Sequence, residues 1–295
     1  MSNDHSQIEF CAPPDPEPRV PTHQLPTNSC DTHAHIIEPL DRDPMDPGRS
    51  YTPPPASLDA YQHLLATLGA DRGVIVQPSV YGTDNRVTLD AVARGGDNYR
   101  AVVVVDDDCT IEQLDAFHAQ GARGARVNLL FSSSARLDNL RALTGKMAEF
   151  GWHLQVLADV STFDDLERFV KTLAVPVVFD HMGHCRADQA MAEPGFGALL
   201  RLMEAGQCWI KLSGAYRITG QTHTPYADVT PVARALIHAN PERVVWGTDW
   251  PHPKIPVPMP NDGDLVDQMD AWFDNDDIRK QVFVDNPAQL YDFPR

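Results

Sequence analysis

The sequence predicts an α/β fold, a (β/α)₈ barrel of the TIM type built as one domain. A chain of 295 residues with 42% hydrophobic residues can form one large core, and single barrels commonly have about 250 residues. Short apolar runs alternate with amphipathic stretches of helical period, as β-α units around a parallel sheet do. Several segments, such as Gly73–Gln77 and Ala101–Val105, contain continuous apolar runs, which is typical of strands buried on both faces.

Eight segments have the composition of barrel strands, and a polar or glycine-containing turn follows each of them. They are Ser29–Asp31, Gly73–Gln77, Ala101–Val105, Ala125–Asn128, His153–Val156, Val177–Asp180, Trp209–Leu212 and Val244–Trp246. Helices between them are expected to begin at the capping residues Ser57, Thr110 and Ser161, where Thr110 forms a capping box with Gln113. Left-handed glycine caps are expected at Gly69, Gly121 and Gly151.

Residues 1–28 differ in composition from the rest of the chain. The segment CAPPDPEPRVPTHQLPTN contains six prolines and no hydrophobic period, so we expect a Pro-rich N-terminal arm that lies extended on the surface or is loosely ordered. The barrel catalytic domain then covers residues 29–295. Two long Pro-rich loops, 36–56 and 250–262, follow the first and eighth strands. Because these strands are neighbours in a closed barrel, both loops are expected to overhang the same part of the active-site rim.

The charge balance restricts the binding partners. With 24 Lys and Arg against 41 Asp and Glu, the net charge is −17, which disfavours binding to nucleic acid or to anionic membranes. No segment has the length of a membrane span, and the N-terminus lacks the basic and apolar regions of an export signal. The five cysteines are widely spaced and form no C-x-x-C pair, which fits a reducing cytoplasm. A monomer and a homo-oligomer are both compatible with the sequence.

The segment Asp31-Thr32-His33-Ala34-His35 lies at the end of the first predicted strand. Side chains alternate along a strand, so His33 and His35 are expected to point together into the barrel mouth. Two imidazoles on one face can ligate a metal or donate hydrogen bonds to a developing oxyanion. Taken alone, an H-x-H pair is also compatible with two unrelated histidines at a polar strand end.

Two further polar residues end predicted barrel strands. His181 follows the sixth strand in VVFDH, and Asp249 follows the eighth in VVWGTD. A lone His181 is compatible with a packed, hydrogen-bonded histidine, and a lone Asp249 with a helix cap. Because the C-terminal ends of all the strands surround one mouth, three histidines and an aspartate there indicate an active site.

Longer motifs carry a family resemblance. The segments DTHAH, VIVQPSVYGTDN, GARVN, GWHLQV, VVFDHMG, WIKLSG, RVVWGTDWPHP and DNPAQLY resemble the amidohydrolase-2 group of the amidohydrolase superfamily. Within that group they are similar to the 2-pyrone-4,6-dicarboxylate lactonases and to related lactonases such as 4-sulfomuconolactone hydrolase. The likeness runs from about residue 28 to the C-terminus. It implies an amidohydrolase-type barrel and a carboxylic-ester hydrolase, a lactonase of aromatic-compound catabolism.

The resemblance implies a catalytic role for the residues at the strand ends. Asp249 would activate water, and His33, His35 and His181 would polarise the carbonyl of a lactone. The ring oxygen would then leave, giving an open-chain dicarboxylate or keto acid.

The resemblance also implies substrate contacts. Arg126 of the G-x-R-x-N segment and Arg217 after the K-x-S segment would hold substrate carboxylates, for which a planar guanidinium is well suited. Tyr51 in the first long loop and Ser79 after the second strand would complete the contacts. His252, three residues after Asp249 in DWPHP, is a further candidate because the second long loop would carry it over the site.

Two positions depart from the lactonase pattern. Ser132 stands where the lactonases have a second arginine, and Leu157 stands where they have a tyrosine at the end of the fifth strand. One anion contact and one hydroxyl are therefore missing. We expect a small anionic lactone related to 2-pyrone-4,6-dicarboxylate but different from it, such as a muconolactone-type compound, including 4-sulfomuconolactone.

The sequence leaves the cofactor open, between none and a single Zn²⁺. The three histidines and Asp249 suit a tetrahedral zinc site. The fifth strand ends in Leu157, however, so His153 or His181 would have to replace the ligand that metal-using members of the superfamily supply there. Without metal, the histidines would have to polarise the carbonyl strongly, because a carboxylate with an ordinary pKa of about 4 is a weak base at neutral pH.

Three other functions are compatible with these residues. A metal-dependent decarboxylase of the same superfamily would also use the H-x-H pair and the final aspartate. A sugar-acid lactone isomerase would keep Asp249 as a base and would move a proton without net uptake of water. A barrel that binds an anion without turning it over is the third alternative, although a carboxylate beside the ligand gives such a binder no advantage.

Overall fold

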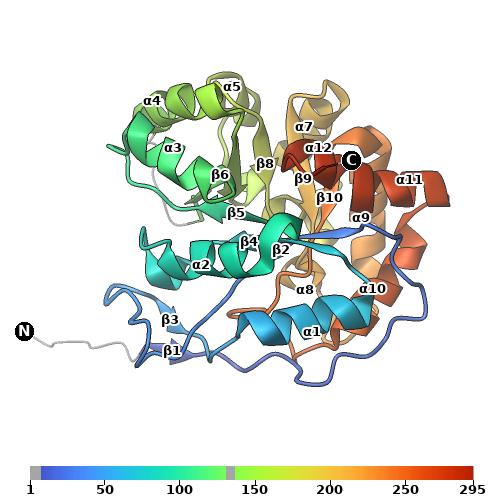
Figure 1. The fold of residues 1–295 in the computed structure, drawn as a ribbon. Helices are drawn as coiled ribbons and strands as arrows, with labels where there is room; N and C mark the ends of the chain where they lie inside the picture. The colour runs from blue at the N-terminus through green and yellow to red at the C-terminus, as the bar shows by residue number, and fades with distance from the viewer. Residues whose placement is uncertain (1–7, 131–136, 295) are drawn as a thin grey trace, which may run out of the picture.

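The computed structural model describes residues 8–130 and 137–294. Its centre is an eight-stranded parallel sheet that curls into a nearly closed barrel with helices around it (Figure 1). Neighbouring strands follow one another around the sheet in chain order, which confirms the predicted (β/α)₈ fold. The barrel strands are β2 (Cys30–Ala34), β4 (Arg72–Val76), β5 (Tyr99–Val103), β6 (Ala122–Asn128), β7 (His153–Leu157), β8 (Val177–Phe179), β9 (Cys208–Leu212) and β10 (Val244–Trp246).

All eight predicted strands form, but several are longer than their apolar runs. β2 continues past Asp31 to Ala34, which pairs with Ile75 of β4. β5 and β6 begin earlier than predicted, at Tyr99 and Ala122, where each residue pairs with the neighbouring strand. Backbone pairing therefore decides these boundaries, and the hydrophobic pattern only locates the middle of each strand.

The helices lie outside the barrel and at its rim. In the described ranges they are α1 (Leu58–Leu68), α2 (Arg86–Gly95), α3 (Ile111–Ala119), α4 (Leu137–Met147), α5 (Leu166–Lys171), α6 (Ala187–Ala190), α7 (Pro194–Glu204), α8 (Ala215–Ile218), α9 (Thr230–Ala239), α10 (Asp262–Asp267), α11 (Asp276–Lys280) and α12 (Asn286–Leu290). None of these helices is long and apolar enough to span a membrane.

Most of the predicted helix ends are confirmed. The Ser57 side chain caps α1, and Thr110 forms the expected capping box with Gln113 at the start of α3. Gly69, Gly121 and Gly151 all have positive φ, which glycine adopts without the steric cost that other residues have.

The predicted cap at Ser161 is wrong. Ser161 lies in a 3₁₀ turn, where its backbone N–H and its hydroxyl both donate to the Asp159 carboxylate. The helix begins later, and Asp165 caps it by accepting from the backbone N–H of Arg168. Both Asp159 and Asp165 are good capping residues, and the polar stretch between them does not reveal which one starts the helix.

The barrel closes between β2 and the segment that follows β10. The Asp249 N–H donates to the His33 carbonyl oxygen, and the His35 N–H donates to the Trp250 carbonyl oxygen, each at 2.8 Å. Ala34 and Trp250 form an isolated parallel bridge between these two segments. The ends of the first and last barrel strands therefore lie side by side, as the closed-barrel prediction requires.

Asp31 is the buried centre of this closure. Its carboxylate accepts from the Thr248 hydroxyl at 2.6 Å and the Thr248 N–H at 2.9 Å, and from the His33 N–H and the Tyr61 hydroxyl at 3.0 Å. Burial raises the pKa of Asp31 to about 6, although the bonds to the carboxylate favour its charged form. A buried carboxylate with several donors makes the loss of any one donor costly.

The described part of the N-terminal segment lies against the rim of the barrel. β1 (Glu9–Phe10) pairs in parallel with β3 (Tyr51–Thr52) of the first long loop, and both strands lie at the lower edge of Figure 1. Arg19 donates to Asp264 and Asp267 of α10 at 2.6 Å each. Two-residue strands leave no periodic pattern, so this small sheet is not predictable from sequence.

The C-terminal segment packs against the opposite end of the barrel, where the guanidinium groups of Arg72 and Arg100 lie over the Phe293 ring. Tyr291 and Phe293, from the C-terminal segment, pack against Cys30, Val74 and Val102. Cys30 is the first residue of β2, so this cluster covers the N-terminal ends of the strands.

The closure around Asp31 yields a stability prediction. Thr248→Val removes the hydroxyl that donates to the buried Asp31 carboxylate and accepts from the Trp250 N–H, and it should lower the free energy of unfolding by about 2 kcal/mol, measured by urea denaturation. Thr67→Val is the matched control, because the Thr67 hydroxyl bonds only to the His63 carbonyl within an exposed helix turn. Equal stability of the two variants would contradict a structural role for the bond between Thr248 and Asp31.

Candidate active site

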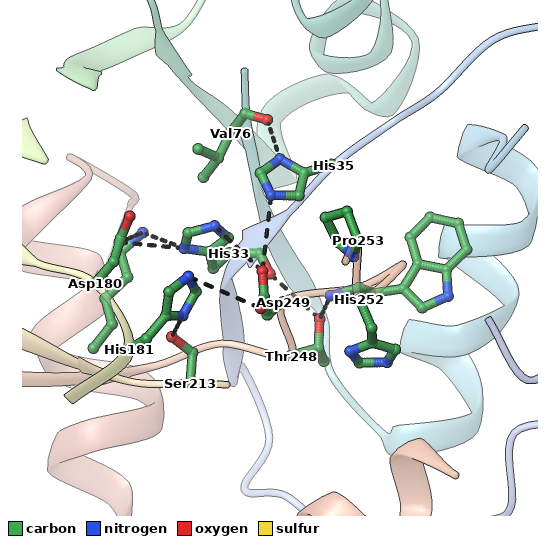
Figure 2. A network of polar contacts seen from close by, with 12 residues as sticks. His33, His35, Val76, Asp180, His181, Ser213, Thr248, Asp249, His252 and Pro253 are labelled. Atoms are coloured by element: carbon green, nitrogen blue, oxygen red, sulfur yellow. Dashed lines mark hydrogen bonds and ion pairs between the residues drawn. The ribbon is translucent and has the colours of Figure 1, made fainter. Parts of the chain in front are cut away.

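His33 and His35 lie at the C-terminal end of β2, with their rings edge to face and their centroids 5.0 Å apart. Figure 2 shows both rings beside Asp249. The Nδ1 of His35 lies 2.8 Å from the Val76 carbonyl oxygen, and because a carbonyl only accepts, Nδ1 carries the hydrogen and Nε2 keeps its lone pair. Burial, together with the charges of His33 and Arg126, lowers the pKa of His35 to about 3, so this ring is neutral.

The backbone orients the other two predicted residues. His181 has a φ of +50° and Asp249 a φ of +65°, in the left-handed region that non-glycine residues seldom adopt. Residues held in such conformations are frequent at functional sites. The Nδ1 of His181 lies 2.9 Å from the Ser213 hydroxyl, which leaves its Nε2 to face Asp249.

Three imidazole nitrogens converge on one carboxylate (Figure 2). The Nε2 atoms of His33 and His35 lie 3.7 Å and 3.8 Å from Asp249 Oδ1, and the Nε2 of His181 lies 3.9 Å from Oδ2. Among the described residues, His33 Nε2 and Asp249 Oδ1 are buried and have no hydrogen-bond partner. The structure therefore brings all four residues from the strand ends together.

The second oxygen of Asp249 is held by two donors. Arg217 Nε and the Tyr216 hydroxyl each donate to Oδ2 at 2.7 Å. Arg217 Nη2 also donates to the Pro253 carbonyl oxygen at 3.0 Å. Arg217, expected to hold a substrate carboxylate, thus has Asp249 as its main partner, and within the described ranges only its Nη1 is left without a hydrogen bond.

Asp249 is ionised in this environment. Burial alone would raise its pKa, but Arg217 and the three histidines outweigh burial and hold the pKa well below its ordinary value. A carboxylate with so low a pKa is a weak base at neutral pH. It can accept a proton efficiently only from a water molecule that has itself become more acidic.

A second buried carboxylate, Asp180, lies on the other side of His33. Its Oδ1 lies 3.4 Å from His33 Nδ1. Its Oδ2 accepts from Gln155 Nε2 at 3.1 Å and from Arg126 Nε at 3.3 Å. Asp180 therefore orients both a histidine of the cluster and the arginine expected to bind substrate, in the way that outer carboxylates orient ligands and catalytic groups.

Lys211 balances Asp180 inside the barrel. Its ammonium group is fully buried, donates to Gln155 Oε1 and to the Thr32 carbonyl oxygen at 2.7 Å each, and lies 3.9 Å from Asp180 Oδ1. Burial, partly offset by Asp180, lowers the pKa of Lys211 to about 8.

Asp180, Lys211 and Tyr216 are site residues that the sequence reasoning misses. Two of them carry a detectable signal: Lys211 lies inside an apolar run predicted to be buried, and Asp180 ends such a run directly before His181. A charge within a strand that is covered on both faces needs a partner in the interior. Tyr216 lies in the short helix α8 and gives no comparable signal.

Tyr51 and Ser79 come from two different rim segments and contact each other. The Ser79 hydroxyl donates to the Tyr51 hydroxyl at 3.1 Å. Burial raises the pKa of Tyr51, and the charges of Arg126 and Arg217 oppose this. The pair therefore lies within electrostatic reach of both arginines.

His252 is fully buried and has protein groups at both ring nitrogens. Its Nδ1 lies 2.9 Å from the Tyr216 hydroxyl, and its Nε2 lies 3.2 Å from Asp262 Oδ1. The backbone N–H of His252 donates to the Asp249 carbonyl oxygen at 2.8 Å. This turn carries the ring toward Tyr216 and Asp262, so His252 does not take the substrate-facing position expected from the second long loop.

The remaining predicted positions fall outside the cluster. Ser132 lies outside the described residues. Leu157 ends β7. His153 begins β7 and is buried beside Tyr291, with ring centroids 5.1 Å apart, so it lies at the other end of the strand and is not positioned to replace a metal ligand at the mouth.

Two sets of residues bring ligand atoms together closely enough for one metal ion. They are His33, His35 and Asp249, and His33, Asp180 and His181, and within each set the ligand atoms lie within 4.8 Å of one another. Neutral imidazoles with a carboxylate are ligands that zinc prefers. The buried His33 Nε2 and Asp249 Oδ1 fit such an ion, because facing acceptors repel each other unless a cation or a donor lies between them.

The chain is similar to known proteins over most of its length. Residues 30–293 match the family model described as amidohydrolase. The sequence is 36% identical to 4-sulfomuconolactone hydrolase of Hydrogenophaga intermedia over 90% of this chain and 89% of that protein. It is 33% identical to 2-pyrone-4,6-dicarboxylate hydrolase of Comamonas testosteroni over 93% of each.

Two further similarities concern proteins of Agrobacterium. The sequence is 32% identical to D-galactarolactone isomerase of Agrobacterium fabrum over 92% of this chain and 94% of that protein. The fold is similar to the apo crystal structure of ATU3138 of Agrobacterium tumefaciens, with a TM-score of 0.82 and 31% identity, covering 93% of this chain and 99% of that one.

The buried pair of Lys211 and Asp180 yields a stability prediction. Lys211→Met leaves the Asp180 carboxylate without its ammonium partner and should lower the free energy of unfolding by about 3 kcal/mol, measured by urea denaturation. The double variant Lys211→Met/Asp180→Asn should recover part of this loss. Lys171→Met is the control, because it breaks only an exposed ion pair with Glu167 within a helix. If Lys211→Met lowered the free energy of unfolding as little as Lys171→Met, the result would contradict a stabilising pair between Lys211 and Asp180.

Proposed function

The chain belongs to the amidohydrolase family of hydrolases, and from that premise we propose that its substrate is a small lactone that bears anionic groups. The names of two relatives support the substrate class, since one is a hydrolase of 4-sulfomuconolactone and the other of 2-pyrone-4,6-dicarboxylate. The reaction would then belong to the catabolism of aromatic compounds.

The convergence of three imidazoles on the Asp249 carboxylate carries this proposal. Their Nε2 atoms lie 3.7 Å to 3.9 Å from the carboxylate oxygens, and His33 and Asp249 are fully buried. A pure binder of anions gains nothing from an ionised carboxylate at such a place. A hydrolase needs one to accept the proton of the attacking water.

Arg126 is the residue best suited to hold the anionic group of the substrate. Asp180 pairs with its Nε side, so the Nη side is left to bind a carboxylate or a sulfonate through two parallel hydrogen bonds. On a chain with a net charge of −17, an anion needs such a local cation. Leu157 supplies no hydroxyl, which favours a muconolactone-type substrate, such as 4-sulfomuconolactone, over 2-pyrone-4,6-dicarboxylate itself.

Hydrolysis of the lactone would begin with removal of a proton from water by Asp249. Asp249 Oδ1 accepts the proton of the attacking water, because Oδ2 already accepts from Arg217 and Tyr216. Water adds to the lactone carbonyl, the bond from the carbonyl carbon to the ring oxygen breaks, and the ring oxygen takes up a proton. The product is an open chain with one new carboxylate.

The orientation of His35 favours zinc over a metal-free mechanism. Its Nδ1 donates to the Val76 carbonyl and its ring is neutral, so its Nε2 accepts and cannot donate a hydrogen bond to the lactone carbonyl. We therefore propose that His33, His35 and Asp249 hold one Zn²⁺, with His181 beside them. When bound, the ion would polarise the carbonyl and lower the pKa of water, which suits a carboxylate as weakly basic as Asp249.

Lactone isomerisation is the second candidate function. It is favoured by the similarity to D-galactarolactone isomerase, which is nearly as strong as the similarity to the two hydrolases. An isomerase would use Asp249 to move a proton without adding water to the product. A decarboxylase would instead release carbon dioxide.

A panel of lactones in ¹⁸O-labelled water tests the function. Muconolactone, 4-sulfomuconolactone, 2-pyrone-4,6-dicarboxylate, galactarolactone and an uncharged lactone are each incubated with the enzyme, and the products are weighed by mass spectrometry. We expect ring opening of a muconolactone-type anion, with one solvent oxygen in the new carboxylate. Asp249→Asn should lower kcat on the order of 10³-fold, whereas the exposed Asp59→Asn should not.

Each alternative leaves its own signature in the same assay. A product of unchanged mass that contains no labelled oxygen would indicate an isomerase. Release of carbon dioxide would indicate a decarboxylase. Full turnover by Asp249→Asn would contradict the role assigned to the carboxylate.

Removal of metal tests the zinc proposal. Dialysis against a zinc chelator should abolish ring opening, and added Zn²⁺ should restore it. His35→Ala should reduce the bound zinc measured by plasma mass spectrometry, whereas His118→Ala, on helix α3 far along the chain from the site residues, should not. Full activity in a protein that contains only substoichiometric metal would instead support the metal-free mechanism.

A further inference from the structure

Tyr216, His252 and Asp262 form a row of buried polar side chains beside Asp249. They come from three separate elements: Tyr216 lies in α8, His252 in the turn after β10, and Asp262 at the start of α10. Each of the three is at most 1% exposed. Burying polar groups is costly unless they are paired with one another, so the order of their contacts is informative.

The contacts run in one line from Asp262 to Asp249. Asp262 Oδ1 lies 3.2 Å from His252 Nε2, His252 Nδ1 lies 2.9 Å from the Tyr216 hydroxyl, and that hydroxyl lies 2.7 Å from Asp249 Oδ2. The rings of Tyr216 and His252 also meet edge to face, with centroids 5.3 Å apart.

The direction of the hydrogen bonds follows from the donors available. An ionised carboxylate only accepts, so the single hydrogen of the Tyr216 hydroxyl points to Asp249 Oδ2. The hydroxyl oxygen then accepts from His252, which must carry a hydrogen on Nδ1. At the far end, His252 Nε2 and Asp262 Oδ1 lie 3.2 Å apart, within ion-pair distance but without a hydrogen bond among the described residues. The two hydrogen bonds of the row, from His252 Nδ1 to the Tyr216 hydroxyl and from that hydroxyl to Asp249 Oδ2, thus both donate toward Asp249.

We infer that Tyr216, His252 and Asp262 are positioning residues that set the orientation of the Asp249 carboxylate. The inference rests on the proposed function and deepens it. With Tyr216 and Arg217 both on Oδ2, the carboxylate cannot turn about its Cβ–Cγ bond, and Oδ1 stays toward the histidines. His252 keeps the Tyr216 hydrogen on Asp249, and Asp262 lies within ion-pair distance of the other ring nitrogen of His252.

Orientation matters because the reacting oxygen has to lie within hydrogen-bond reach of the attacking water. A misplacement of about 1 Å can lower a rate roughly 100-fold without any loss of substrate binding. The row therefore acts on kcat rather than on KM. None of its members is placed to touch the substrate.

Kinetics of single and double variants test this chain of contacts. Tyr216→Phe removes only the hydroxyl and should lower kcat roughly 10- to 100-fold, the usual effect of losing an outer partner of a catalytic group, with little change in KM. Tyr226→Phe is the matched control, because the Tyr226 hydroxyl is buried and has no hydrogen-bond partner among the described residues, and it should leave kcat unchanged.

Variants of His252 distinguish a positioning role from a role in packing alone. His252→Ala should lower kcat in the wild-type background but not in the Tyr216→Phe background, because His252 acts only through the hydroxyl. His252→Asn should retain more activity than His252→Ala. Asparagine tolerates the positive φ of this position and its amide can donate where Nδ1 did.

A second measurement does not need turnover. In protein labelled with ¹⁵N-histidine, the NMR spectrum of the wild type should show a hydrogen on His252 Nδ1, identified by its loss in His252→Asn. That resonance should shift in Tyr216→Phe and stay in place in Tyr226→Phe. A wild type that opens no lactone would contradict the proposed function, while this spectrum would still decide on the chain of contacts.

Three results would overturn the inference. The first is a kcat of Tyr216→Phe equal to that of the wild type. The second is an equal loss of kcat from His252→Ala in both backgrounds, which would mean that His252 does not act through Tyr216. The third is a His252 Nδ1 without hydrogen in the wild type, since the hydroxyl hydrogen would then be drawn away from Asp249.

Discussion

The pairing of the first and last barrel strands is the constraint on which the site depends. His33 and Asp249 are far apart in the chain, and they meet because the backbone N–H of Asp249 bonds directly to the His33 carbonyl at 2.8 Å. Asp31 stabilises this junction from the interior by accepting from Thr248 and from the His33 N–H. The same few residues therefore close the barrel and set the distance between the histidine pair and the carboxylate.

This dual role explains which parts of the site can be predicted from sequence. An alternation of apolar runs and helices implies a barrel, and in a barrel every strand ends at the same mouth. His33, His35, His181 and Asp249 all lie at strand ends, so topology alone brings them together. Side-chain pairing is different, because it depends on strand register and on backbone angles. Neither the contact of Arg217 with Asp249 nor the turn that places His252 beside Tyr216 leaves a pattern in the sequence.

The fold shows the same division. The middle of each strand follows from hydrophobicity, whereas its ends depend on the neighbour with which it pairs, as at Ala34 and Tyr99. The start of α5 depends on a competition between two nearby aspartates, Asp159 and Asp165, and the local sequence does not decide it. Structure that follows a periodic pattern of residues can be predicted from the sequence. Structure that depends on contacts between segments far apart in the chain cannot.

Two ionised carboxylates flank His33, and their surroundings give them different tasks. Asp180 faces Nδ1: its Oδ2 accepts from Gln155 and Arg126, and its Oδ1 lies 3.4 Å from His33 Nδ1 and 3.9 Å from the Lys211 ammonium group. Asp249 faces Nε2 and has all of its donors on Oδ2. Oδ1 of each carboxylate is buried without a hydrogen bond among the described residues, but Oδ1 of Asp249 faces the Nε2 atoms of His33 and His35, whereas Oδ1 of Asp180 lies beside the Lys211 ammonium group. Because Arg217 bonds to Oδ2 and holds the pKa of Asp249 low, Oδ1 is the oxygen at which Asp249 can meet a metal ion or a proton from water.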